Sequence, residues 1–215
     1  MAVSSYFGSY GTFQAPEREQ GVHLLSADSL VGDELAFEVR NEGGKTTVVL
    51  ANRFGGEIGV LDAKTAHDVQ LCQARGWNVR LLLASVYVKQ ASKESHMGHW
   101  GEVVLMAYAP ECADSFDVFT RNMARLLGEG IRPEVDLMQS SVAQVIDSGG
   151  AWQPNGRRAA ISKEGNVLVK GRLSMNDKLV EQARKRNPGC MVAGGAFIAL
   201  VVFLVVYLVK LLLCF

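Results

Sequence analysis

The chain has 215 residues, 48% of them hydrophobic and 20% charged, and its formal net charge is zero. The apolar excess is concentrated at the C-terminal end, which excludes a single water-soluble core for the whole length. The four cysteines lack the spacing of a disulfide framework or a zinc knuckle, as expected in a reducing compartment. These values predict one modest domain with appended segments.

Residues 1–20 contain Ser, Gly and aromatic residues without a clear period. They have neither the basic nor the apolar region of a secretory signal peptide. We expect a loose N-terminal arm here, followed by a cytosolic α+β domain at 21–148.

Five segments between residues 35 and 108 have the composition of short strands separated by Gly-rich turns. Such strands hide their edges best by curling, so the pattern predicts a small β-barrel or a strongly bent sheet. Asp62 and Gly76 suit the two ends of a helix at 63–75. The expected strands are 35–40, 46–52, 57–61, 77–88 and 101–108.

Apolar residues recur at helical spacing in two later segments, 113–129 and 133–147. Pro133 suits the first turn of the second helix. Residues 149–189 then predict a basic juxtamembrane linker with a hairpin around 159–173 and a short helix at about 176–187.

The segment from Cys190 to Val209 has twenty residues without a charge. At 1.5 Å per residue a helix of this length spans about 30 Å, the thickness of a bilayer core. We therefore expect a single transmembrane helix at 190–213, so that the protein is tail-anchored. Arg184, Lys185 and Arg186 precede this span, and basic residues stay on the cytoplasmic side, which places the N-terminal domain in the cytosol.

The zero net charge conceals an uneven distribution. Residues 1–150 hold 12 Lys/Arg and 19 Asp/Glu, whereas residues 151–190 hold 9 Lys/Arg and 3 Asp/Glu. Beside a membrane span, anionic lipid head groups are the nearest partner for such a basic stretch, and nucleic acid is less favoured. The alternative is a topology signal with a solvated face. The basic residues that we expect near the membrane are Arg157, Arg158, Lys170, Arg172, Arg184, Lys185 and Arg186.

His96 and His99 share one polar loop, and Cys112 follows the next expected strand. A structural metal site needs three or four converging ligands, so these residues are weak candidates, and a solvated loop is favoured. The chain contains no nucleophile elbow, phosphate-binding loop, dinucleotide fingerprint or His-Glu-x-x-His motif, and we predict no cofactor.

The run from Leu35 to Tyr108, especially GGEIGVLDAKTAHDVQLCQARGWNVRLLLASVYV, resembles HIRAN-type β-barrel domains. Those domains also pair two strands, place Ile-Gly before a helix and return with long strands. The resemblance implies a barrel that binds ends of single-stranded DNA. The family's Glu-Pro-x-Asn-x-x-Asp segment is replaced by Arg40-Asn41-Glu42-Gly43-Gly44, so no binding residue is carried over.

Two classes of function remain at this point. An anchor confers location, which favours a membrane-tethered binding or adaptor module with an unknown ligand and a protein partner. The alternatives are a tethered enzyme whose active site is dispersed along the chain and HIRAN-like binding of nucleic-acid ends. Convergence of His67, His96, His99 and Cys112 in the fold would favour the enzyme.

Overall fold

The computed structural model describes residues 5–42, 45–89, 98–158, 162–163, 166–171 and 176. The described helices are α1 (Arg18–Leu25), α2 (Ala63–Ala74), α3 (Ala113–Gly128) and α4 (Gln139–Asp147), with a 3-10 turn at Pro110–Cys112. The described strands are β1 (Tyr6–Ala15), β2 (Glu34–Glu42), β3 (Lys45–Ala51), β4 (Glu57–Leu61), β5 (Asn78–Lys89), β6 (His99–Tyr108), β7 (Ile131–Pro133), β8 (Gly156–Arg158), β9 (Ser162–Lys163) and β10 (Asn166–Lys170).

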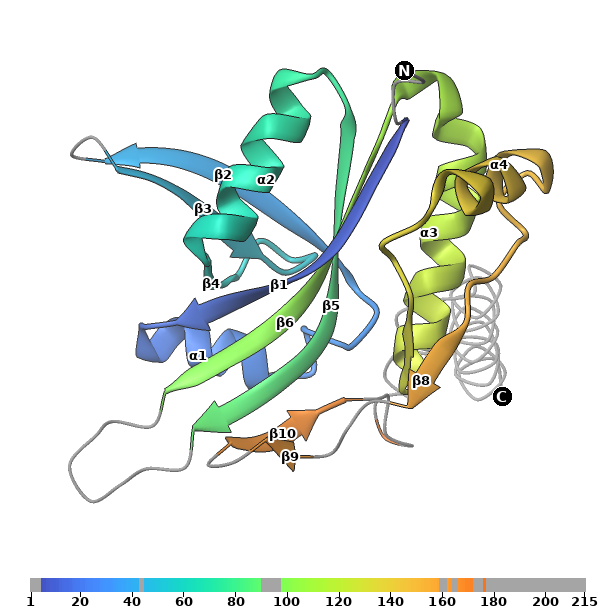
Figure 1. The fold of residues 1–215 in the computed structure, drawn as a ribbon. Coiled ribbons are helices and arrows are strands. Elements are labelled where there is room, and N and C mark those ends of the chain that lie inside the picture. The colour runs from blue at the N-terminus through green and yellow to red at the C-terminus, as the bar shows by residue number, and fades with distance from the viewer. Residues whose placement is uncertain are drawn as a thin grey trace, which may run out of the picture. The chain divides into compact units, whose positions relative to one another are not determined.

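Six antiparallel strands close into a barrel (Figure 1). Their order is β2-β3-β4-β1-β6-β5, and β2 returns to β5 through the pairs Glu34↔Leu82 and Leu35↔Leu81. Closure gives each of these strands two neighbours, which removes open edges at the seam. The α+β class and the small barrel predicted from the strand pattern are thereby confirmed.

Strand β1 corrects the expectation of a loose arm over residues 1–20. It pairs with β6 along all ten of its residues and with β4 near Phe13. Its glycines suggested a loop, but they serve close packing: a Cβ at Gly8 would overlap the carbonyl oxygen of Val135, and one at Gly11 would overlap Thr65. The strand also has buried residues on both faces, so no simple alternation appears in its sequence.

Helix α2 begins at the expected residue and ends at Ala74, one residue before the expected end. The Asp62 side chain accepts a hydrogen bond from the Thr65 amide, and Gly76 adopts φ +72° just after the helix. Its inward residues Ala66 and Val69 join the apolar filling of the barrel. The remaining buried members of this inner core are Phe13, Ala15, Leu24, Leu35, Val48, Leu50, Ile58, Leu61, Leu81, Leu83, Val86, Val103 and Leu105.

A second core lies outside the barrel, between the sheet and helices α3 and α4 (Figure 1). Helix α3 agrees closely with the predicted 113–129, but the predicted helix at 133–147 begins only at Gln139. Pro133 instead ends strand β7, where a residue without an N–H is tolerated. Phe116, Phe119 and Met123 are fully buried in this outer core.

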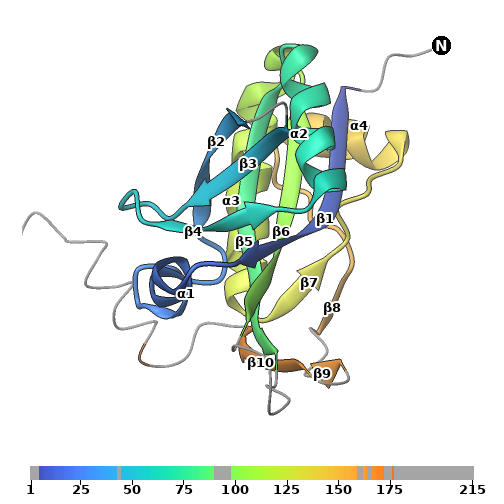
Figure 2. The same cartoon turned by 90° about the vertical axis from the view of Figure 1, so that its left-hand side faces the viewer.

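Part of the predicted basic linker belongs to the folded unit. Strand β8 pairs with β7, and β10 pairs with β5 and with β9, which confirms the hairpin (Figure 2). The chain divides into two compact units, Met1–Ser174 and Met175–Phe215. The predicted span at 190–213 lies outside the described residues, and among the described helices none is long and apolar enough to cross a membrane.

Candidate anion-binding site on strands β7 and β8

Strands β7 and β8 form a short antiparallel ribbon that places two arginines side by side. Arg132 of β7 lies directly opposite Arg157 of β8 in the register of the pair. Directly opposed residues project from the same face of a ribbon, and like charges in this position repel each other. An anion beside either arginine reduces this repulsion.

Arg132 has one such anion within the protein. Its Nη1 donates to Glu102 Oε2 at 2.5 Å, and its guanidinium carbon lies 3.7 Å from the centroid of the Tyr10 ring. The Tyr10 hydroxyl donates to the carbonyl of Pro133 at 2.8 Å, which fixes the ring beneath the arginine. Arg132 is therefore held in one orientation while 37% of its side chain stays exposed.

Glu102 is a carboxylate with 5% exposure on strand β6. Besides Arg132, its Oε2 accepts a hydrogen bond from Ser85 Oγ at 2.9 Å and a long one from Tyr87 Oη at 3.5 Å. A β-bulge between Leu83 and Ser85 brings Ser85 opposite Glu102. A buried carboxylate needs such partners, because an unpaired one would cost several kcal/mol.

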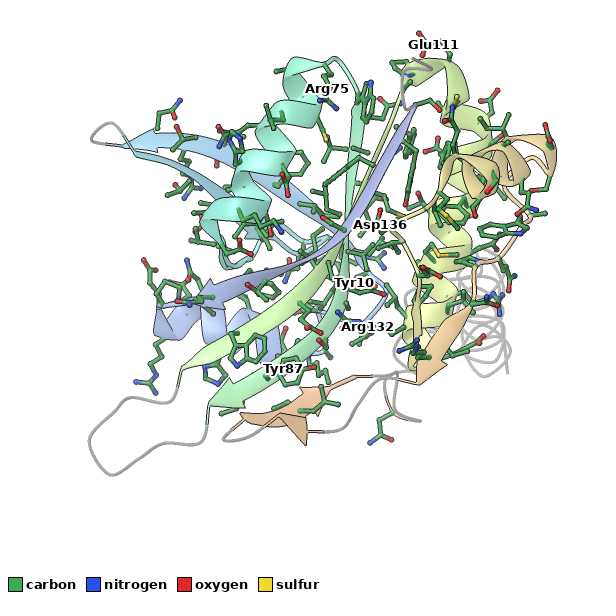
Figure 3. The ribbon with its side chains drawn as sticks, viewed as in Figure 1. Tyr10, Arg75, Tyr87, Glu111, Arg132 and Asp136 are labelled. Atoms are coloured by element: carbon green, nitrogen blue, oxygen red, sulfur yellow. The ribbon has the colours of Figure 1, made fainter. Side chains whose placement is uncertain are left out.

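Two tyrosines and a tryptophan border the charged pair. Tyr87 stacks on Trp100 with ring centroids 4.3 Å apart. In Figure 3, Tyr10 and Arg132 lie next to each other, and Tyr87 lies farther along β5. Burial raises the pKa of Tyr87, and burial also raises the pKa of Tyr10 although Arg132 acts against it. A tyrosine hydroxyl has an ordinary pKa of about 10 and is neutral at physiological pH, so the upward shifts leave both hydroxyls as hydrogen-bond donors.

Arg157 differs from Arg132 in having no compensating carboxylate among the described residues. Its side chain is exposed, and no ion pair or hydrogen bond joins it to the described part of the chain. Glu102 therefore compensates Arg132 alone, and the neighbouring Arg157 leaves a positive charge at the surface. A guanidinium binds phosphate oxygens through parallel N–H donors, so the ribbon can bind an anion.

The structure separates the basic residues that the sequence grouped together. Lys170 directs its ammonium group to backbone carbonyls within the folded unit. Arg158 lies in β8 opposite Ile131. Arg172, Arg184, Lys185 and Arg186 lie outside the described residues.

Among the described candidates, His67, His99 and Cys112 do not share a site. His99 begins strand β6 and Cys112 follows its end, and a ten-residue strand separates its ends by about 30 Å. His99 lies against α1, because a Cβ at Gly21 would be 2.8 Å from its Nδ1, whereas His67 is exposed on α2. His96 lies outside the described residues, and the described ones include no group of three potential ligands for a metal.

A polar hollow lies between α1 and the loop before β4, away from the arginine pair. It has a volume of about 360 Å³ and is lined by Glu17, Glu19, Gln20, His23, Gly55, Gly56 and Glu57. A hydrogen bond from Arg40 lowers the pKa of Glu57, so this carboxylate is ionised over a wide pH range. Glu19 lies 3.8 Å from His23 within this lining, whereas the ion-pair partner of Glu57 is Arg40, which lies outside it.

Glu102, Tyr10 and Arg132 were not predicted from the sequence. Glu102 is a single charge beside the apolar run VVLMAY, and an isolated charge there indicates a buried ion pair. No local sequence pattern marks Tyr10 or Arg132, because their contact depends on the tertiary fold.

Comparison of the chain with protein-family models, with curated proteins and with solved structures gave no match in any of the three.

Proposed function

We propose that the chain is a membrane-tethered binding module, anchored by residues 190–213 with its folded unit in the cytosol. In this proposal the unit contacts anionic phospholipid head groups through Arg157 and Arg132. The observation that supports it is the cross-strand arginine pair, which has one internal carboxylate and leaves Arg157 exposed. Each basic residue near an anionic membrane surface contributes about 1 kcal/mol.

The anchor is tested with the full chain and a chain ending at residue 189. The full chain should remain with membranes after alkaline carbonate extraction, and the shortened chain should be released. Protease added outside intact cells should leave the folded unit whole. Release of the full chain would refute the anchor, and digestion from outside would reverse the orientation.

Head-group contact is tested with the full chain in lipid nanodiscs that contain dansyl-labelled head groups. Energy transfer from the native tryptophans should be larger with anionic than with zwitterionic lipid, and salt should reduce the difference. Arg157→Gln should remove much of this difference between the two lipids. Arg53→Gln is the matched control, because this exposed arginine lies over Phe54 in the loop after β3.

Equal transfer with both lipids at low salt would contradict the head-group contact and leave the anchor unaffected. The resemblance to HIRAN-type domains makes nucleic acid the alternative ligand in this test. A single-stranded oligonucleotide would meet the same arginine and could stack on Trp100, which borders the pair. If such an oligonucleotide binds the zwitterionic sample and Arg157→Gln abolishes that binding, nucleic acid replaces lipid as the ligand.

A further inference from the structure

Lys170 makes an arrangement of contacts that the proposed function does not use. Its Nζ donates to the carbonyl oxygens of Leu24, Ser26 and Ser29 at 3.0, 2.6 and 2.9 Å. An ammonium group has three N–H donors and no acceptor. Each of these three carbonyls can accept one of the N–H donors.

The carbonyls converge because of how helix α1 ends. The last carbonyls of a helix have no partner within it, and the helix dipole makes this end attractive to cations. The hydroxyls of Ser26 and Ser29 both donate to the carbonyl of His23, at 2.8 and 2.9 Å. These two bonds fold residues 26–29 back across the helix end, and Ser29 is fully buried there.

We propose that the carbonyl oxygens of Leu24, Ser26 and Ser29 form a binding site for a primary ammonium group, which Lys170 fills from within the chain. Lys170 is the last residue of β10, and its pairing with β5 is irregular between Leu168 and Lys170. The ammonium site therefore holds β10 at the point where its ladder of hydrogen bonds weakens. Filling of the site joins α1, β10 and β5.

The chemistry of the site distinguishes ligands. Three carbonyls around one nitrogen suit the tetrahedral N–H directions of an ammonium, whereas a guanidinium presents its donors in a plane. Tetramethylammonium has the same charge and no N–H group. A primary amine should thus fill a vacated site, and tetramethylammonium should not.

The test uses the full chain in nanodiscs. Lys170→Met keeps most of the aliphatic stem and removes the donors, so we expect the Tm to fall by about 5–10 °C. Amides of β10 and of residues 26–30 should exchange hydrogen about tenfold faster. Lys64→Met, a change at an exposed position of α2, is the matched control and should leave both values unchanged.

Chemical rescue gives the second measurement. In Lys170→Ala, n-propylammonium replaces the missing end of the side chain and should restore slow exchange at residues 26–30. Tetramethylammonium at equal ionic strength should have no effect on the exchange in Lys170→Ala. The Lys170→Arg variant should exchange at a rate between those of the native chain and Lys170→Ala. Unchanged exchange in Lys170→Met, or equal rescue by the two cations, would overturn the proposal.

Discussion

The two faces of the barrel sheet are packed with different kinds of side chain. The inner face is filled almost entirely by aliphatic side chains around Phe13, whereas the outer face meets α3 through a cluster of aromatic rings. Phe116 stacks between Tyr6 and Tyr108, with centroid separations of 4.9 and 5.2 Å. A closed barrel fixes its own geometry, but a helix resting on a sheet can slide, so the outer face needs directional contacts.

Hydrogen bonds provide the directional contacts on the outer face. Tyr6 donates to the carbonyl of Val135 at 3.0 Å, and Tyr108 donates to Asp117 of α3 at 2.5 Å. Arg80 joins Tyr108, Asp117 and Glu34 in the same network. The inner face depends instead on shape: a Cβ at Gly101 would lie 2.5 Å from the Phe13 ring.

The largest expected effect is on the inner face. Phe13→Ala should lower the free energy of unfolding by about 3–5 kcal/mol, because the closed barrel cannot collapse around the cavity. Urea unfolding followed by tryptophan fluorescence measures the change. Phe54→Ala removes the same ring from a site that is 62% exposed and should cost less than about 0.5 kcal/mol. Equal costs at the two positions would contradict a shape-dependent inner core.

An intermediate effect is expected where the outer face holds its ion pair. Glu102→Gln should cost about 1–3 kcal/mol, since Arg132 loses its charge partner while remaining partly solvated. A double-mutant cycle with Arg132→Met isolates the pairwise contribution. Additive effects in that cycle would show that the two residues stabilise the fold independently.

The smallest effect concerns the polar cap of α2. Burial by itself raises the pKa of Asp62, but hydrogen bonds from Thr65 and Thr12 outweigh it and lower the pKa overall. A carboxyl with a lowered pKa in the folded state stabilises above its unfolded value, and this stabilisation is lost as the pH falls through the folded pKa. Asp62→Ala should cost about 1 kcal/mol at pH 7. Unfolding measured between pH 7 and 2 should show the difference shrinking below about pH 4.

The sequence predicted those elements whose limits are encoded locally. Alternation and Gly-rich turns located β2 to β6, and the Asp62 cap with Gly76 located α2, because these signs act within a few residues. Strand β1 was missed since its glycines are explained only by neighbours distant in the chain, Val135 and Thr65. The start of α4 was misplaced because Pro133 is tolerated both in the first turn of a helix and at a strand end.

The candidate site could be predicted only in part. Arg157 stood out because it belongs to a basic stretch, but the sequence could not separate it from Lys170. Lys170 differs from Arg157 because it has hydrogen-bond partners in the folded unit, and these partners are set by the tertiary fold. Glu102 and Arg132 are thirty residues apart in sequence, and they meet only because β7 crosses the outer face of the barrel.

The pairing of β1 with β6 also limits when this part of the barrel can fold during protein synthesis. Tyr6 pairs with Tyr108, so the ten-residue ladder between these strands cannot form until residue 108 has left the ribosome. At about 5–20 residues per second, the first strand waits roughly 5–20 s for its partner. During that interval the aromatic side chains of β1, among them Tyr6 and Phe13, lack the neighbours that bury them in the folded unit.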